Sequence, residues 1–439
     1  MRDPGLLRAA ALLGPAAVLG LLWHWRPPGA RERAAVLLAC CWNFAALAGV
    51  QALAARAGWW RFDAQGGLFL GIPVDLLLGW TVLWGAVPIL ALPRAPLPIV
   101  IALAGWLDLL LMPRCQPVVV LGAGWLRGEA LALAGALLPS LLLARWTSED
   151  RRLAARAVLQ MFLVAGLLLG VLPAAILEGT GGSWSGAFWS SWQERPRGAG
   201  LWLQVLGLAA LPGLSAVQEF VERGRGTPLP FDAPRRLVTT GLYRYIANPM
   251  QVSLCLVLGV WGAALASAWV AAGALIGAAF FAGLADWDED TALAERHGAA
   301  WRRYREAVRC WWPRWRPFAA SPARLYVAQR CDVCSPLAVW LEARRPVGLE
   351  LRAAEDHPER DLVRLTYDPG DGMPDEEGLA ALGRALEHLD LGWALVGAAL
   401  RLPLVRPLLQ VIVDGVGGGP RVVRRTNPAR PRAGNQSRG

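Results

Sequence analysis

The sequence contains no lysine. All 44 basic residues are arginines, which excludes catalysis through a lysine Schiff base. Charged residues make up only 18% of the 439 residues, against about a quarter in an average soluble protein. Hydrophobic residues make up 55%. A chain this apolar has too few polar groups to cover a surface in water, so its composition predicts a membrane protein.

Motifs of several enzyme classes are also missing from the sequence. There is no glycine-rich loop of the kind that joins a strand to a helix in dinucleotide-binding folds. The four histidines and seven cysteines do not supply a complete set of metal ligands at suitable spacing, so no metal site is predicted. The net charge of +10 does not indicate binding to nucleic acid, because the arginines lie between apolar segments rather than among aromatic residues on one basic face.

Long apolar segments are abundant. A helix that crosses a bilayer core of about 30 Å needs roughly 20 residues, and nine segments reach or approach this length. They are residues 5–25, 34–54, 68–90, 97–112, 129–144, 157–177, 200–217, 250–266 and 267–285. The predicted fold is therefore an all-α polytopic membrane protein. The first segment is interpreted as a retained helix with an interfacial anchor at 23–26, and the alternative is a cleaved signal peptide.

The arginines predict how the helices are oriented. The arginine-rich connections 26–33, 145–156 and 223–236 all lie on the cytoplasmic side if the N-terminus lies outside. Everything after Asp286 is then cytoplasmic, and the expected location is a bacterial inner membrane. The connection 178–198 is predicted to be an outer loop, whose residues Trp184, Trp189 and Trp192 suit the membrane interface.

Several polar residues fall inside the predicted spans. Such residues are costly in a membrane and often functional. The main candidates are Asp75 and Asp108, followed by Asn43, Gln51 and Glu129. The alternative is that each of them pairs with a neighbouring helix. No motif assigns a role to the N-terminal membrane region, residues 1–178.

Two polar blocks flank the last pair of apolar segments. The first block includes Gly241-Leu-Tyr243-Arg244-Tyr-Ile-Ala-Asn248-Pro249, and the second is Glu289-Asp290-x-x-Leu-x-x-x-His-Gly298-x-x-Trp301-x-x-Tyr304. Over about residues 198–317 this pair of blocks resembles the integral-membrane methyltransferases of the isoprenylcysteine carboxyl methyltransferase and phospholipid methyltransferase superfamily. The resemblance implies that S-adenosyl-L-methionine is bound and that its methyl group is transferred to a hydrophobic or lipid-like acceptor at the bilayer.

The resemblance also implies which residues hold the cofactor. Asn248 and Pro249 match the family's Arg-Asn-Pro element, in which Asn offers both a donor and an acceptor and Pro fixes the entry into a helix. The chain departs from the family pattern at Ala247, where Arg is frequent. Gly241 and Tyr243 belong to the same predicted set, and Arg244 is predicted to orient the acceptor or the cofactor carboxylate.

The second block supplies the rest of the predicted cofactor site. Glu289 and Asp290 are expected to accept hydrogen bonds from ribose hydroxyls or from the cofactor's amino group, although the family has Glu at the second position. Trp301 and Tyr304 lie three residues apart, on one helical face, and are expected to stack on adenine or face the sulfonium. The alternative function is a transporter or scaffold that retains this fold without catalysis, with Asp75 and Asp108 as its working residues.

The composition becomes that of a soluble domain near Pro322. The pattern predicts, in order, a strand at 324–328, a Cys-x-x-Cys pair, a helix at 335–344, strands at 349–353 and 362–367, and a helix at 375–389. This order is thioredoxin-like. With Trp393 and the later Leu-Pro-Leu, residues 322–416 resemble the small thiol-disulfide oxidoreductase-like family named for its Asp-Cys-Cys motif. Arg330 stands where that family usually has an acidic residue.

The pair Cys331 and Cys334 predicts thiol-disulfide exchange, since Cys-x-x-Cys is the spacing of redox pairs as well as of half a zinc site. A helix N-terminus and Arg330 both favour a thiolate at Cys331, which is therefore the expected attacking group, with a thiol-bearing protein as its partner. The alternatives are a zinc site, for which His357 and His388 lack suitable spacing, and a domain that only packs. Residues 417–439, rich in Gly, Pro and Arg, are predicted to be disordered.

Overall fold

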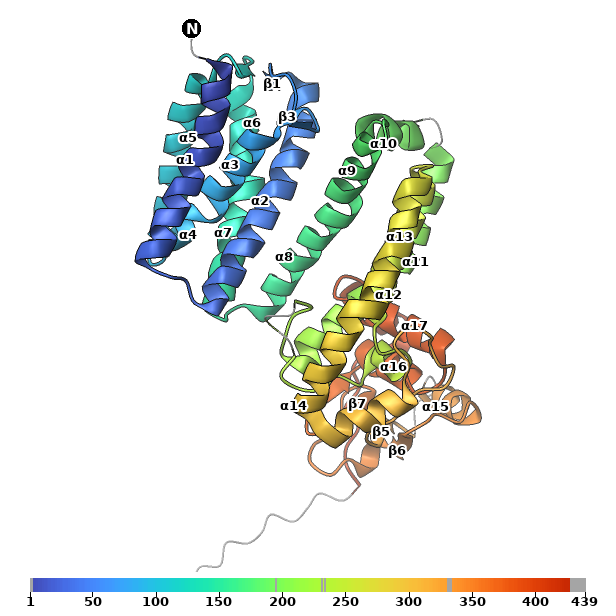
Figure 1. The fold of residues 1–439 in the computed structure, drawn as a ribbon. Coiled ribbons are helices and arrows are strands. Elements are labelled where there is room, and N and C mark those ends of the chain that lie inside the picture. The colour runs from blue at the N-terminus through green and yellow to red at the C-terminus, as the bar shows by residue number, and fades with distance from the viewer. Residues whose placement is uncertain (1–2, 194–195, 230–231, 233, 330–333, 427–439) are drawn as a thin grey trace, which may run out of the picture. The chain divides into compact units, whose positions relative to one another are not determined.

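The computed structural model describes residues 3–193, 196–229, 232, 234–329 and 334–426 (Figure 1). The chain divides into two compact units, of which the first comprises 1–205, 226–233 and 258–274 and the second 206–225, 234–257 and 275–439. Three helices contribute residues to both units: α11 (Pro196–Glu219), α12 (Pro249–Ala264) and α13 (Ala268–Phe280).

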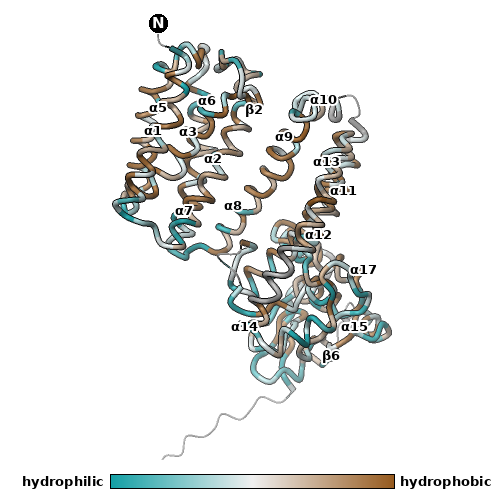
Figure 2. Tube along the Cα trace, in the orientation of Figure 1, coloured by the Kyte–Doolittle hydropathy of each residue, from teal (hydrophilic) through white to brown (hydrophobic). Residues whose placement is uncertain are grey.

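The first unit is a bundle of apolar helices, coloured mainly brown and white in Figure 2. Its remaining helices are α1 (Pro4–Trp25), α2 (Ala30–Ala57), α3 (Val74–Gly85), α4 (Val87–Ala91), α5 (Leu97–Leu111), α6 (Trp125–Ala132), α7 (Leu138–Ser148), α8 (Leu153–Ala165), α9 (Leu172–Gly179) and α10 (Trp184–Gln193). Strand β1 (Trp60–Phe62) pairs antiparallel with β4 (Val119–Leu121), and β2 (Leu68–Phe69) pairs with β3 (Ile72–Pro73). Helix α2 packs against α3 and α7, and α1 packs against α3.

Two helical rods of this unit contain a π-helical segment directly before a proline. Segment η2 (Leu133–Leu137) joins α6 to α7 ahead of Pro139, and η3 (Gly166–Val171) joins α8 to α9 ahead of Pro173. Proline has no N–H, and its ring clashes with the carbonyl four residues earlier, so a wider turn accommodates it. Each rod therefore remains continuous and long enough to cross a membrane.

Seven helical segments among the described residues are long and apolar enough to span a membrane, which indicates an integral membrane protein. They are Pro4–Trp25, Ala30–Ala57, Val74–Ala91, Leu97–Cys115, Trp125–Ser148, Leu153–Gly179 and Gly200–Gly224. They correspond to the first seven predicted segments. The last two predicted segments are helical but shorter, at Pro249–Ala264 and Ala268–Gly283. At about 1.5 Å per residue, the apolar part of neither helix reaches across a core of about 30 Å.

The predicted outer loop 178–198 contains a helix instead. Aromatic packing accounts for α10, since Trp184 and Phe188 lie one turn apart and both contact the ring of Trp261, with centroid distances of 6.3 and 6.2 Å. The side chains of Trp189 and Trp192 lie outside the described residues.

The C-terminal part of the second unit contains a four-stranded sheet in the order β6-β5-β7-β8. Strand β5 (Ala323–Val327) is parallel to β6 (Leu349–Ala353) and antiparallel to β7 (Thr366–Asp368), which pairs antiparallel with β8 (Glu376–Glu377). Helix α15 (Cys334–Ala343) connects β5 to β6. Helices α16 (Leu379–Leu386), α17 (Leu391–Arg401) and α18 (Val405–Val413) follow the sheet.

The structure corrects three predictions in this region. The predicted helix 375–389 begins only at Leu379, because Glu376 and Glu377 pair with β7 and Gly378 adopts φ 62° and ψ −127°. The predicted strand 362–367 is shorter, because Leu362 pairs with Val423 instead. That pairing also orders the start of the tail that was predicted to be disordered from Gly417, while residues 427–439 lie outside the described part of the chain.

A cluster of buried charges lies inside the second unit. Glu219, at the end of α11, accepts hydrogen bonds from Arg384 at 2.8 Å and from Arg401 at 2.6 Å. Both guanidinium groups also bind Glu387, at 3.2 and 2.7 Å. All four side chains are at most 2% exposed. Two carboxylates and two guanidinium groups balance in charge, which makes their burial tolerable.

Glu376 adds a third carboxylate at the edge of this cluster, 2.7 Å from Arg384. Burial opposes its ionisation, but the nearby charges of Arg384 and Arg401 outweigh that effect and hold the pKa of Glu376 below its usual range. The cluster joins α11 to α16 and α17. Its Glu219 is more than 150 residues away in the chain from Arg384 and from Arg401.

Helix α14 (Asp286–Ala307) is interrupted at Gly298, which has φ 54° and ψ −124°. A residue with a Cβ is strained in this region of backbone space, whereas glycine adopts it freely. The helical pattern therefore stops at His297 and restarts after Gly298, and the second part carries Trp301 and Tyr304.

Replacing Gly298 by alanine is expected to destabilise the second unit by about 1 to 3 kcal/mol, because the backbone conformation disfavours any Cβ. No neighbouring atom lies within 4 Å of that Cβ, so the effect would come from the backbone alone. Thermal unfolding of the purified protein measures it. Gly283→Ala is the control, since that Cβ also meets nothing within 4 Å and the φ of Gly283 is not positive. Equal melting temperatures for the two variants would contradict the prediction.

Replacing Glu219 by glutamine is expected to cost about 3 to 5 kcal/mol, because it leaves Arg384 and Arg401 without their shared counter-charge. The matched control is Glu222→Gln on the same helical rod. Glu222 also binds Arg401, at 3.0 Å, but its side chain is 40% exposed, so its loss should cost about 1 kcal/mol or less. Unfolding of both variants is followed by circular dichroism in detergent, and similar losses would show that burial does not set the cost.

Candidate functional site

The first predicted block forms a short turn and the start of a helix in the second unit. The turn η6 (Gly241–Arg244) begins at Gly241, whose φ is 63°. A Cβ at this position would lie 2.8 Å from a side-chain carbon of Glu219, so both the backbone and the space favour glycine. The sequence thus places a glycine where the chain passes closest to the buried charges.

The buried charge cluster holds this turn directly. The backbone N–H of Gly241 donates to Glu387 at 3.1 Å, and the hydroxyl of Thr240 donates to Glu219 at 2.6 Å. The hydroxyl of Tyr245 donates to the carbonyl of Glu387 at 2.9 Å. The position of the first block therefore depends on a residue of the C-terminal domain.

The segment that follows α14 holds the other side of the block. Ala247 and Asn248 donate their backbone N–H groups to the carbonyls of residues 309 and 310, at 2.9 and 3.3 Å. In return, Arg314 and Phe318 donate to the carbonyls of Tyr245 and Arg244, at 3.0 and 2.8 Å. These backbone hydrogen bonds fix the chain without requiring particular side chains.

Asn248 and Pro249 occupy the N-terminus of α12. Pro249 is the first helical residue, where its missing N–H costs nothing, and Asn248 precedes it. The carbonyl of Asn248 accepts the first hydrogen bond of the helix, from Val252 at 3.1 Å.

The second block meets the first through Tyr304. Its side chain is 1% exposed, and its hydroxyl donates to the carbonyl of Tyr243 at 2.8 Å. Trp301 packs beside it, with a ring-centroid distance of 5.6 Å, in a cluster that includes Ala247 and Phe318. Burial raises the pKa of Tyr304 well above its usual range, so the hydroxyl remains a donor. Two blocks separated by a helix pair in sequence are thus in contact.

Arg244 is buried between these elements with few partners. One guanidinium nitrogen donates to the carbonyl of Phe318 at 3.2 Å. Its Nε has no hydrogen-bond partner, and no carboxylate among the described residues forms an ion pair with it. A buried cation with an unused donor is suited to bind an anionic group.

Four other predicted residues have side chains outside the described part of the chain. The backbone of Glu289 and Asp290 belongs to α14, and Cys334 is the first residue of α15. Cys331 lies wholly outside the described residues. The structure therefore brings together Gly241, Tyr243, Arg244, Asn248, Pro249, Trp301 and Tyr304.

The two histidines considered as zinc ligands have other contacts. His388 donates from Nδ1 to the carbonyl of Val347 at 2.7 Å and accepts from the hydroxyl of Tyr367 at 3.0 Å, which fixes one neutral tautomer. Burial, together with the charge of Arg244, holds the pKa of His388 well below its usual range. His357 packs edge-on against Tyr326 at 4.7 Å.

Sequence reasoning missed the residues that position the first block: Glu219, Arg384, Glu387 and Arg401. One signal was present. Arg384 and Arg401 interrupt apolar helical patterns, and an arginine on an apolar face usually has a buried partner. The identity of that partner was not readable, because Glu219 is about 165 residues away from Arg384.

The polar residues inside the predicted spans mostly pair with neighbours. Asp75 binds Arg8 of α1 at 2.6 Å. Gln51 accepts from the indole of Trp60 at 2.8 Å, and Asp108 accepts from the indole of Trp80 at 2.5 Å. Asn43 donates to the carbonyl four residues earlier, at 3.0 Å.

The chain was compared with protein-family models, curated proteins and solved structures. No family model, no curated protein and no solved structure matches it.

Proposed function

We propose that the protein is an integral-membrane methyltransferase that uses S-adenosyl-L-methionine and acts on a hydrophobic or lipid-like acceptor. The observation that carries the proposal is the contact between the two motif blocks, through Tyr304 and the carbonyl of Tyr243. Their order and residues resemble those of membrane methyltransferases. The apolar helices of the chain support a site that an acceptor reaches from the bilayer.

The residues around Arg244 fit such a cofactor. Its unused Nε–H can donate to the cofactor carboxylate, or to a carboxylate on the acceptor. Asn248 at the start of α12 offers a side-chain amide near the positive end of the helix. Glu289 and Asp290 are proposed to accept from the ribose hydroxyls or the amino group.

The cofactor, when bound, supplies a methyl group on a sulfonium, and the sulfur keeps the electron pair as the methyl group leaves. The protein has to align the acceptor behind that methyl group and exclude water. Trp301 and Tyr304 make one wall of the proposed site rigid, since both are almost fully buried. Arg244 is proposed to orient the negative group that enters beside it.

The C-terminal domain is proposed to carry thiol-disulfide exchange at Cys331 and Cys334. The strand order β6-β5-β7-β8, with a helix between the two parallel strands, supports the proposed thioredoxin-like core. Cys334 stands at the start of that helix, where unpaired backbone N–H groups favour a nearby thiolate. The arginine-rich connections support a cytoplasmic location for this domain.

Replacing Glu289 by glutamine is expected to weaken binding of S-adenosyl-L-methionine by about 10- to 150-fold, because a charge-assisted hydrogen bond contributes about 1.5 to 3 kcal/mol. Isothermal titration of the purified protein in detergent measures the affinity. Glu306→Gln is the control, since Glu306 is exposed on the same helix. Asn248→Ala is tested alongside. Unchanged affinity in both Glu289→Gln and Asn248→Ala, with normal melting temperatures, would remove the second block and Asn248 from the site.

The Cys334→Ser variant is expected to accumulate a mixed disulfide through Cys331 when it is offered a small disulfide, because the resolving thiol is gone. In the wild type, alkylation of Cys331 should report a pKa below the value of about 8.5 for an ordinary thiol. Mass spectrometry of the labelled peptide measures both. The Cys331→Ser variant is the control and should form no such adduct. An ordinary titration together with no adduct in Cys334→Ser would leave the domain with a packing role.

A further inference from the structure

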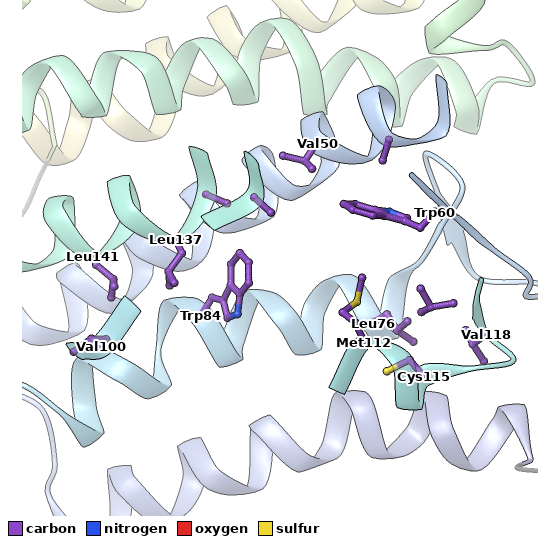
Figure 3. Close-up of a cluster of buried hydrophobic side chains, with 14 residues drawn as sticks. Val50, Trp60, Leu76, Trp84, Val100, Met112, Cys115, Val118, Leu137 and Leu141 are labelled. Carbon is purple, nitrogen blue, oxygen red and sulfur yellow. The ribbon is translucent and has the colours of Figure 1, made fainter. Parts of the chain in front are cut away.

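The first unit contains a partly open cavity that the proposed methyltransferase does not use. It has a volume of about 70 Å³ and lies between β1, α2, α3, α5 and α6. Most of its wall is apolar, and Figure 3 shows Trp60, Leu76, Trp84 and Met112 gathered in this interior. The polar groups in the wall are Gln51, Asp108 and Glu129.

Two of these three polar groups are acids with no basic partner. Asp108 is 2% exposed and Glu129 is 4% exposed, and their carboxyl groups share a hydrogen bond. That bond requires a proton on only one of the two carboxyl groups, so the pair can carry one negative charge. No Arg or His lies among the described residues that line the cavity. An uncompensated charge in an apolar membrane helix bundle is costly, and such charges usually serve a ligand.

Glu129 has an oxygen available for that ligand. Its Oε1 is buried and accepts no hydrogen bond from an N–H group or a hydroxyl group of the described residues, although the residue lines the cavity. The neighbouring polar groups are already engaged: the indole N–H of Trp80 donates to Asp108, and that of Trp60 donates to the side-chain oxygen of Gln51. The unused acceptor calls for a donor, and a donor that carries positive charge also stabilises the ionised state of the carboxyl pair.

The size and lining of the cavity select among cations. A volume of about 70 Å³ equals roughly two water molecules of about 30 Å³ each. Hard metal cations need about six oxygen ligands, which two carboxyl groups and one amide cannot supply. Indole faces attract organic cations, and the wall contains three tryptophans. A primary ammonium group with one carbon meets all of these conditions.

We propose that this cavity binds a small primary ammonium group, with its N–H donors on Glu129 and Asp108 and its carbon against the indoles of Trp60, Trp80 and Trp84. The probe that matches the volume is methylammonium. Because a ligand of two heavy atoms has a low ceiling of affinity, its dissociation constant is expected in the millimolar range. The site is independent of cofactor binding in the second unit.

The test uses the full chain in lipid nanodiscs. Thermal unfolding is followed while methylammonium chloride is titrated through the millimolar range. Sodium chloride and tetramethylammonium chloride, each at equal ionic strength, are the controls for the size and the chemistry of the cation. Methylammonium alone should raise the melting temperature in a saturable way. The double variant Asp108→Asn and Glu129→Gln, which keeps the shape and removes both ionisable groups, should weaken this response at least 10-fold. Glu149→Gln, an exposed acid paired with Arg151, should leave it unchanged.

A second measurement does not depend on any variant folding. A hydrophobic carbodiimide reacts with buried protonated carboxyl groups, and peptide mapping shows whether Glu129 or Asp108 is modified. Methylammonium should slow modification at these residues in the wild-type protein, and sodium should not. Equal effects of sodium and methylammonium, or no protection by methylammonium, would overturn the proposal and leave the cavity with only water and a shared proton.

Discussion

The buried carboxylate of Glu219 is the constraint on which the second unit depends. It lies at the end of an apolar helix with no access to solvent, so its charge has to be compensated inside the protein. Arg384 and Arg401 provide that compensation from α16 and α17. The same charges bring Glu387 to the backbone of Gly241. One electrostatic requirement therefore connects a membrane helix, the C-terminal domain and the first motif block.

This arrangement gives the C-terminal domain a structural part in the proposed site. If the C-terminal domain were joined to the rest of the second unit only by a flexible connection, the block 241–249 would be held by hydrogen bonds on one side only. Here the hydrogen bonds of Gly241 and Tyr245 to Glu387 support it from the side of α16, and residues 309–318 support it from the other. The proposed methyl transfer needs a rigid site, and the proposed thiol chemistry resides in the same compact unit.

The first unit depends less on buried charges, since its helices are apolar enough to be surrounded by lipid. Prolines within the rods are accommodated by wider helical turns, which keep each rod long enough to span. Most polar side chains in the spans find a partner on a neighbouring element, as Asp75 does with Arg8. Glu129 keeps one oxygen without a hydrogen-bond partner. Asn43 and Gln160 also keep unpartnered side-chain atoms, but Glu129 in addition lines a cavity, which makes it the candidate binding group.

The sequence by itself determined the seven long membrane helices, because length and hydropathy are local properties of the chain. It also placed β5, α15 and β6 to within one residue, since alternation and helix-start signals are local too. It identified the two blocks, but not what holds them. Only the tertiary structure decided that Tyr304 donates to Tyr243 and that Arg384 and Arg401 neutralise Glu219. Those contacts join residues far apart in the chain, and their energy comes from burial, which a local pattern does not encode.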